Sequence, residues 1–221
     1  MIKESFLEMA KRHKAGDMLV QGDYQTCSVG CFNRDYGNDL NDFKALAGST
    51  GYREWTHHIQ EAIFEGLPED DAKNWHVRFA EKMETVKDFD ALYHSFMVGV
   101  LKVALPHDKY GVVQPVIDLH ENYKDATPED WENAKRETNA AGAEAWTGPV
   151  TLSESYSWSA DAVIHAAIHA TDEAMSADEV ARNTVEAVAK AGDPSEYYSD
   201  EVFFVAWQEI SDVFLNAKGG E

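Results

Sequence analysis

Two cysteines and two adjacent histidines are spaced in a way that could support metal chemistry. Cys27 and Cys31 are separated by three residues, and His57 and His58 follow in a segment with helical periodicity. Thiolate sulfur and imidazole nitrogen are the usual ligands of structural zinc, and four of them would complete a tetrahedral site if the chain folded back. The alternative is two thiols packed in a core, where free cysteines are common. We favour packed thiols and expect no cofactor, with zinc as the alternative.

A second histidine pair, His165 and His169, lies one helical turn apart in a predicted helix over residues 160–175. Two histidines at this spacing can bind a divalent metal, and Asp161 and Asp172 fall on the same flank. However, no glutamate lies between the histidines as it does in the metalloprotease pattern. The apolar residues of the segment already explain an amphipathic helix, so we interpret this flank as solvated.

Histidines beside carboxylates could also support general acid-base catalysis. In a chain this acidic such neighbours arise by chance, and we interpret them as side-chain pairs on exposed helix faces. The sequence contains no phosphate-binding loop, dinucleotide glycine pattern, nucleophile elbow or calcium loop, so we favour a non-catalytic role over an enzyme. The two sets are His57 and His58 with Glu54 and Glu61, and His120 with Asp118 and Glu121.

The elements that must position these residues are predicted to be helices. Apolar residues recur with helical spacing, and Ser, Thr, Asp and Pro mark several helix starts, which predicts a mainly α, compact multi-helix bundle. Near residues 18–32, glycines and β-formers follow no sustained period, so an irregular segment or a small hairpin is expected there. The predicted helices cover residues 2–14, 52–63, 89–104, 128–145, 160–175, 177–191 and 195–217, and one more opens at Pro68.

The chain divides by composition into two helical parts, residues 1–146 and residues 155–221, which we expect to pack as one unit. Residues 147–155 interrupt the helical periodicity with glycine, proline and serine. The formal net charge of the chain is −21, and residues 155–221 are its more acidic part. Free nucleic acid and anionic membranes are therefore poor partners.

Three further features predict a cytoplasmic location. The N-terminal residues lack the uninterrupted apolar stretch of a secretory signal. The most apolar region, Phe89 to Leu105, is too short and too polar to span a bilayer, so no membrane association is expected. Two cysteines exclude a disulfide framework and indicate a reducing compartment.

Three segments of the sequence carry a resemblance to a known family. They are Cys27-Ser28-Val29-Gly30-Cys31, Glu61-Ala62-Ile63-Phe64-Glu65-Gly66-Leu67-Pro68 and Trp75-His76-Val77-Arg78-Phe79. They resemble an uncharacterised family of bacterial and phage proteins, over roughly the first 145 residues, and the resemblance implies no named activity. The family usually has an alanine- and arginine-rich helical C-terminus, and here that part is more acidic. A phage-encoded member would act in the cytoplasm of the host cell.

Acidic residues accumulate toward the carboxyl end, where they could form one anionic surface that imitates nucleic-acid phosphates. We therefore predict a non-catalytic protein that binds and inhibits a basic, nucleic-acid-handling partner, such as a nuclease, a defence complex or a toxin. The alternative is that these charges serve solubility alone. The surface would comprise Glu154, Asp161, Asp172, Glu173, Asp178, Glu179, Glu186, Asp193, Glu196, Asp200, Glu201 and Asp212.

The apolar stripe of the last predicted helix supports a third interpretation. Trp207 and Phe214 lie on this stripe, and they could pack on a second copy of the chain instead of on their own core. The protein would then be a self-associating scaffold, for example a homodimer.

Overall fold

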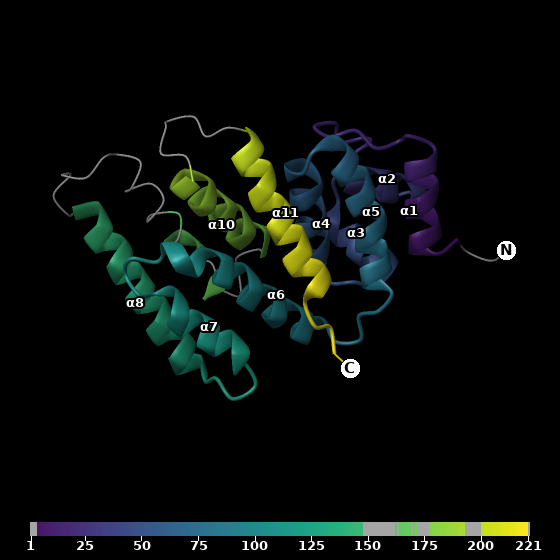
Figure 1. Ribbon diagram of the computed structural model, residues 1–221. Coiled ribbons are helices and arrows are strands. Elements are labelled where there is room, and N and C mark those ends of the chain that lie inside the picture. Colours follow the sequence, from purple (N-terminus) through teal and green to yellow (C-terminus); the bar gives the residue numbers. More distant parts are fainter. Residues whose placement is uncertain are drawn as a thin grey trace. The chain divides into compact units, whose positions relative to one another are not determined.

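The computed structural model describes residues 4–147, 162, 164–168, 170–171, 177–192 and 200–220, with backbone alone at 144–147, 190–192 and 200. These residues form helices and connecting loops without a strand, which confirms the predicted mainly α fold (Figure 1). They belong to two compact units, Met1–Phe89 with Gly219–Glu221, and Asp90–Lys218. We describe each unit separately.

The first unit contains five α-helices whose starts follow from local sequence. At the first helix, Ser5 N donates to Glu8 Oε2 (2.9 Å) and Glu8 N donates to Ser5 Oγ (3.2 Å), a reciprocal capping box. Pro68 precedes the fifth helix, whose first turn is acidic, as the helix dipole favours. The helices are α1 (Phe6–Ala15), α2 (Ser28–Tyr36), α3 (Phe43–Thr50), α4 (Glu54–Gly66) and α5 (Glu69–Met83).

The segment expected to be irregular is so only in its first part. Residues 18–27 form a loop without a hairpin, but residues 28–32 belong to α2, which corrects the expectation. Cys27 caps this helix, because its Sγ accepts a hydrogen bond from Gly30 N (3.3 Å). A Cβ at Gly30 would clash with the carbonyl oxygen of Tyr24, so only glycine lets the helix lie this close to the loop.

In the first unit, α2 packs against α1, α3 and α4, and α5 packs against α1 and α4. Aromatic rings fill the space between them. The ring of Phe32 on α2 stacks on Phe6 of α1 with centroids 3.9 Å apart, and on His76 of α5 with centroids 4.7 Å apart. The core of this unit therefore joins apolar rings to a buried histidine.

The second unit begins at the second residue of α6, the long apolar helix predicted from the sequence. Its apolar face, including Leu92, Phe96 and Val100, is fully buried. The bounds are α6 (Phe89–Ala104), the 3₁₀ helix η1 (Leu105–His107), α7 (Val113–Glu121), α8 (Pro128–Thr147), α10 (Ala177–Gly192) and α11 (Asp200–Asn216).

Helices α6 and α11 pack closely in the second unit. Gly99 has no Cβ where Val213 approaches, and the rings of Phe96 and Phe214 lie edge to face with centroids 5.5 Å apart. Helix α10 lies beside α11 (Figure 1). Trp207 and Phe214 are 1% and 0% exposed, so the stripe considered for self-association is already covered within the single chain.

The structural division of the chain differs in position from the compositional one. The two units divide between Phe89 and Asp90, whereas the sequence suggested residues 147–155, of which 148–155 lie outside the described chain. Helix α11 is described from Asp200 onward, and the predicted start near residue 195 lies outside the described residues, while α6, α8 and α10 begin where expected. Helices α2, α3 and α7 are absent from the predicted set.

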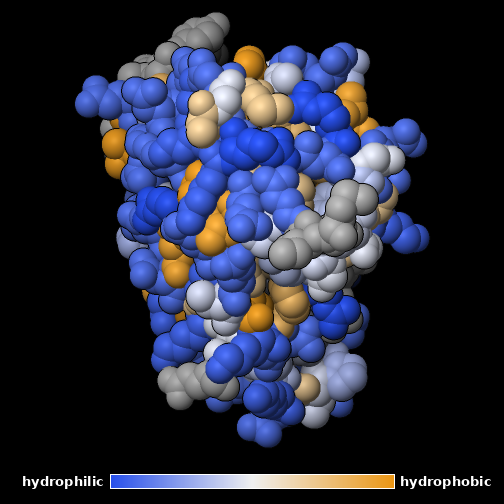
Figure 2. All heavy atoms as spheres, turned by 90° about the vertical axis from the view of Figure 1, so that its right-hand side faces the viewer, coloured by the Kyte–Doolittle hydropathy of each residue, from blue (hydrophilic) through white to orange (hydrophobic). Residues whose placement is uncertain are grey.

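The surface in Figure 2 is mainly hydrophilic, as the high content of charged residues predicts. The face shown in Figure 2 is covered mainly by hydrophilic residues, and hydrophobic residues occupy small separate patches. Within the described part of the chain, no helix has both the length and the apolar character that crossing a bilayer demands.

Candidate functional site

An acidic hollow of about 460 Å³ lies between α7 and α8 in the second unit. The two helices are joined by a short loop and lie side by side (Figure 1). Four carboxylates, two amides and several apolar groups line this hollow, and neither Lys nor Arg is among the lining residues. The acidic hollow is defined by Pro115, Asp118, Leu119, Asn122, Asp125, Ala126, Asp130, Asn133, Ala134 and Glu137.

Local hydrogen bonds fix one of these carboxylates at the start of α8. The Thr127 hydroxyl and backbone N donate to Asp130 Oδ2 (2.6 and 2.9 Å), and Asp130 N donates to the Thr127 hydroxyl (3.3 Å). The hydroxyl and backbone hydrogen bonds from Thr127 lower the pKa of Asp130. This side chain therefore stays ionised near neutral pH.

A second carboxylate, Asp118, is held by its own helix. Gln114 Nε2 donates to Asp118 Oδ1 (2.7 Å), and Asn122 Nδ2 donates to the Asp118 carbonyl (2.8 Å). Both donors are neutral amides, so the charge of Asp118 is not neutralised by them. The lining of the hollow therefore combines two carboxylates held by local hydrogen bonds with apolar groups such as Leu119 and Ala134.

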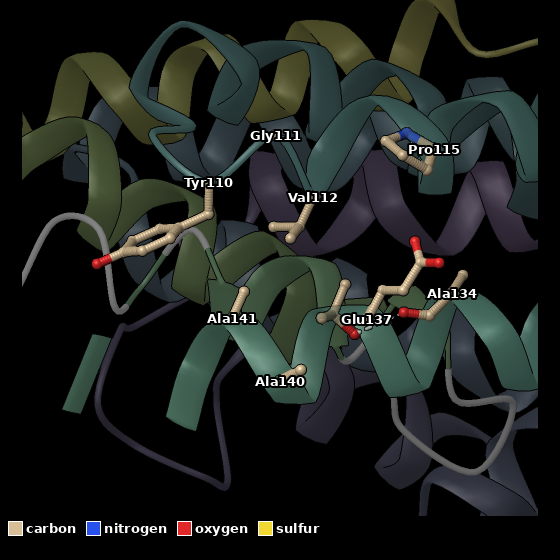
Figure 3. A pocket seen from close by; sticks show the side chains of 9 residues that line it. Tyr110, Gly111, Val112, Pro115, Ala134, Glu137, Ala140 and Ala141 are labelled. Carbon is tan, nitrogen blue, oxygen red and sulfur yellow. Dashed lines mark hydrogen bonds between the residues drawn. The ribbon is translucent and has the colours of Figure 1, made fainter. Parts of the chain in front are cut away.

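A smaller hollow of about 310 Å³ shares Pro115, Ala134 and Glu137 with the acidic hollow. In Figure 3, Glu137 extends from α8 toward the α7 side of the gap, and Tyr110 stands above Ala141 at the other end. The two hollows thus share one wall, with carboxylates at one end and an aromatic ring at the other.

This arrangement is chemically suited to a lysine or arginine side chain. Such a side chain has an apolar stem and a cationic head, which match the apolar groups and the carboxylates that line the hollow. A carboxylate can also accept two hydrogen bonds from one guanidinium group.

The acidic residues predicted toward the carboxyl end are described only in part. Those described lie on α10 and α11, which pack against each other. Asp178 forms an ion pair with Arg182 (3.7 Å), and its side chain is 16% exposed. Glu179 and Glu186 are half-buried, Glu201 and Asp212 are exposed, and Asp200 is placed by its backbone alone. Outside the described residues lie Glu154, Asp161, Asp172, Glu173, Asp193 and Glu196.

The acidic hollow was missed in the sequence. Summing charge along the chain pointed to the last third, whereas these carboxylates come from α7, α8 and the loop between them. The helix start at Thr127 and Pro128 was recognised, but the helix that faces it, α7, was not. The sequence therefore indicated only the helix that forms one side of the hollow.

The first unit contains a chain of hydrogen bonds between buried polar side chains, which we call the buried relay. His13, His57, His76, Ser28 and Gln60 are each 0% exposed, although polar groups are rarely buried without partners. The relay runs in the order Asp35, His13, His76, Ser28, Gln60, His57 and Thr50, with separations of 2.7, 3.1, 2.9, 2.6, 2.9 and 3.1 Å.

Asp35 fixes the direction of the hydrogen bonds in the relay. An ionised carboxylate only accepts, so His13 Nε2–H donates to it and His13 Nδ1 is left to accept from His76 Nε2–H. His76 Nδ1 then accepts from the Ser28 hydroxyl, whose oxygen accepts from Gln60 Nε2. From Asp35 to Ser28, each ring N–H group and the Ser28 hydroxyl therefore donates to one acceptor.

The other half of the relay completes the pattern. Gln60 Oε1 accepts from His57 Nδ1–H, and His57 Nε2 lies 3.1 Å from the Thr50 hydroxyl, which itself donates to the carbonyl of Leu46 (2.9 Å). Burial lowers the pKa of His57 to about 4 and holds the pKa of His76 far below its usual value. Burial also lowers the pKa of His13, although the hydrogen bond that His13 donates to Asp35 acts in the opposite direction. All three rings are therefore neutral at neutral pH.

Ser28 resembles a serine activated by a histidine, but its surroundings indicate a structural role. Its hydroxyl donates to His76 and its oxygen accepts from Gln60, and the side chain is 0% exposed. A nucleophile must reach its substrate, and in this conformation Ser28 cannot. We therefore assign it to the relay.

The cysteines predicted as metal ligands or packed thiols are both buried. Cys27 donates to the carbonyl of Tyr24 (3.7 Å), and Cys31 lies 3.5 Å from the carbonyl of Thr26. Burial is the main cause that raises the pKa of Cys27, and it raises the pKa of Cys31 to about 11. These positions fit the favoured interpretation of packed, protonated thiols.

Four histidines were predicted as possible metal ligands, His57 and His58 with the cysteines and His165 with His169 as a separate pair. His57 belongs to the relay, while His58 stacks on Phe43 with centroids 4.1 Å apart and lies 3.8 Å from Glu54. His165 lies in a helical stretch of the second unit, and His169 falls outside the described residues. Among the residues that the structure describes, no group of three or more His, Cys, Asp or Glu is gathered for a metal. Metal binding stays a prediction.

His120 does not pair with the carboxylates beside it in sequence. It is 2% exposed, its Nε2 donates to the carbonyl of Ala170 (2.9 Å), and its Nδ1 lies 2.8 Å from His94 Nδ1. His94 in turn stacks on Tyr123 with centroids 3.9 Å apart. The expectation of exposed pairing is therefore wrong for His120 and for His57, and it holds for His58.

The three segments that carry the family resemblance meet in the first unit. Ser28 of the first segment bonds to His76 of the third, and Val29 N donates to Glu61 Oε2 of the second (3.0 Å). No family model, curated protein or solved structure matches this chain. The resemblance stays a prediction, and we draw the function from geometry and charge.

Proposed function

We propose that this chain is a non-catalytic acidic protein that binds and inhibits a basic, nucleic-acid-handling protein. The second unit is the binding part, and its acidic hollow takes a lysine or arginine side chain of the partner. The observation that carries this proposal is the hollow itself, with four carboxylates and no lysine or arginine among its lining residues.

Charge distribution supports the same assignment. The second unit contains 23 acidic and 8 basic residues, whereas the first unit contains 17 and 11. A field of this sign speeds encounter with a cationic protein and repels free nucleic acid. Proteins that handle nucleic acid carry basic grooves, so a partner occupied by this chain would lose access to its substrate.

The proposal extends to the setting of the protein. Nucleases, defence complexes and toxins that act on nucleic acid are met in the cytoplasm, which we propose as the location. An anti-defence role in a phage-infected cell accords with the family resemblance, which is itself a prediction. The cytoplasmic location and the anti-defence role both depend on the proposed class of partner.

Binding is tested with a short labelled arginine-rich peptide and the full-length chain. We expect the triple variant Asp118→Asn, Asp125→Asn, Glu137→Gln to bind the peptide about 10-fold more weakly, because each exposed charge pair contributes about 0.2–1 kcal/mol. Fluorescence anisotropy at about 50 mM salt measures the dissociation constant, and binding should weaken at about 200 mM salt.

The matched control neutralises three exposed carboxylates of the first unit, as Asp39→Asn, Asp70→Asn and Asp71→Asn. It changes the net charge by the same amount, and we expect less than about a 2-fold change in affinity, since distant charges are screened. Equal weakening by both variants would show that net charge alone drives binding and that the hollow is not the site. Absence of wild-type binding at low salt would remove the proposal.

Inhibition is tested separately with a basic nuclease and a single-stranded substrate. We expect wild-type protein to slow cleavage at low salt, and the hollow variant to need about 10-fold more protein for the same effect. Peptide binding without any slowing of cleavage would leave a binding protein and contradict the inhibitory part of the proposal.

A further inference from the structure

The first four groups of the buried relay connect the surface of the first unit to its interior. Asp35 has a side chain that is 18% exposed, while His13, His76 and Ser28 are 0% exposed. They come from three helices: Asp35 and Ser28 from α2, His13 from α1 and His76 from α5. Hydrogen bonds between these side chains therefore link α2 to α1 and to α5.

We propose that the relay from Asp35 to Ser28 is a pH-sensitive latch of the first unit, in which one proton taken up at His13 reverses the hydrogen bonds as far as Ser28 and loosens the N-terminal turn of α2 from α5. The proposal concerns the first unit alone and does not rest on the acidic hollow.

The reversal follows from the donors available to each ring. A protonated His13 donates from both nitrogens, so its Nδ1–H points at His76 Nε2, which must then accept. His76 moves its own proton to Nδ1 and donates to the Ser28 oxygen. That oxygen now accepts from His76 and Gln60, and the Ser28 hydrogen loses the acceptor it had.

The charged groups around the relay direct the first proton to His13. Asp35 stabilises an imidazolium there, while Arg12 and Arg34 oppose it, and Arg12 is itself bound by Glu4 and Asp35. A protonated His13 in turn disfavours a second proton on His76. His76 therefore gains a proton only when the latch opens.

Other titratable groups lie near Ser28 and Gln60, at the end of these hydrogen bonds that is far from Asp35. From α4, Glu61 holds Val29 N and contributes to the raised pKa of Cys27, which stays protonated, as does Cys31. His57 is separated from Ser28 by Gln60, whose amide does not titrate. None of these groups supplies a proton to His76 near neutral pH.

The sign of the pH effect follows from the lowered pKa of both histidines. An exposed histidine has a pKa of about 6.5, so below that pH the open state binds protons more readily than the closed state does. Stability of the closed latch is complete above this value and is lost as pH falls. Between about pH 7.5 and about pH 5.5 the opening equilibrium rises about 10-fold through His76, and at most about 100-fold if His13 contributes fully.

The first measurement uses the wild-type full-length chain and needs no substitution. Long-range ¹H–¹⁵N correlation spectra report which ring nitrogen carries the proton. We expect Nε2–H on both His13 and His76 at about pH 7.5 and, as pH falls toward about 5.5, a doubly protonated fraction of His13 that appears together with Nδ1–H on His76. An Nδ1–H on His76 at the higher pH, or unchanged tautomers at the lower one, would overturn the latch.

The second measurement is hydrogen exchange resolved by helix and corrected for intrinsic rate. We expect amides of α2 to lose about 10-fold to 100-fold of their protection over the same pH range. His76→Gln keeps one donor and one acceptor without a titrating ring, so its α2 amides should lose less than about 10-fold. Equal loss in this variant and in wild type would contradict the role of His76.

The matched control is His58→Gln, which removes a partly exposed histidine of the same unit that is not in the relay. It should keep the wild-type pH dependence of α2. If His76→Gln did not fold, the tautomer spectra of the wild-type chain would still decide between the two outcomes.

Discussion

At the scale of single residues, Gln60 joins the two halves of the buried relay. Its amide donates to Ser28 Oγ (2.6 Å) and accepts from His57 Nδ1 (2.9 Å). Its backbone carbonyl accepts from Trp75 Nε1 (3.0 Å). Because all of these groups are buried, water cannot replace a lost partner.

Replacing Gln60 by Leu should destabilise the protein by about 2–4 kcal/mol, since His57 Nδ1–H would lose its acceptor in the core and Ser28 would lose a donor. Urea denaturation of the full-length chain measures the change. The same substitution at the exposed Gln114, which bonds only to Asp118 in the structure, should change stability by about 0.5 kcal/mol or less. Similar losses at both positions would contradict the importance of the relay.

The relay could not be read from the sequence, because its members are scattered over five helices. His57 was placed beside Glu54 and Glu61 by sequence spacing, yet its partners are Gln60 and Thr50. Helical spacing gives the neighbours on one helix face and is silent about contacts between helices. Cys27 and Cys31, by contrast, lie where their favoured interpretation expected them, since burial of a free thiol is a property of one residue.

At the scale of elements, helix α2 depends on a close approach to the preceding loop. Gly30 lies where any Cβ would clash with the backbone oxygen of Tyr24, which cannot move aside as a side-chain end could. Gly48 of α3 offers a contrast, because a Cβ there would meet nothing within 4 Å. Alanine substitutions at Gly30 and Gly48 can therefore be compared as a test position and its control.

Gly30→Ala should destabilise the first unit by about 2 kcal/mol or more, because the loop and α2 must separate. Gly48→Ala should be neutral or stabilising by up to about 1 kcal/mol, since alanine favours the helix and finds open space. Chemical denaturation of both variants tests this. A stable Gly30→Ala would show that the loop can shift and that its packing on α2 is loose.

Elements with strong periodicity were predictable, and those defined by tertiary contacts were not. Helix α6 was recognised over its full length because its apolar residues recur every three to four positions. Helix α2 is short and glycine-containing, and it is fixed by Cys27 as its cap and by packing around Phe32. The acidic hollow was not predicted for the same reason, because it depends on the tertiary contact between α7 and α8.

At the scale of the whole molecule, negative charge is distributed unequally between the two units. The first unit has a formal charge of −6 and the second of −15. Like charges repel more strongly in the compact state than in the open one, which lowers stability at low ionic strength. Added salt screens this repulsion over a Debye length of about 10 Å at 0.1 M.

Raising salt from about 20 mM to about 200 mM should therefore protect amides of the second unit more than those of the first, by about 3-fold or more. Helix-resolved hydrogen exchange measures both units in one sample. The variant Asp118→Asn, Asp125→Asn, Glu137→Gln has less repulsion to screen, so its second unit should respond less than wild type, while its first unit should respond as before. An equal response of both units in the wild-type chain would mean that the excess charge is too dispersed to act as a local field, and the same result would weaken the case for capture of a cationic partner.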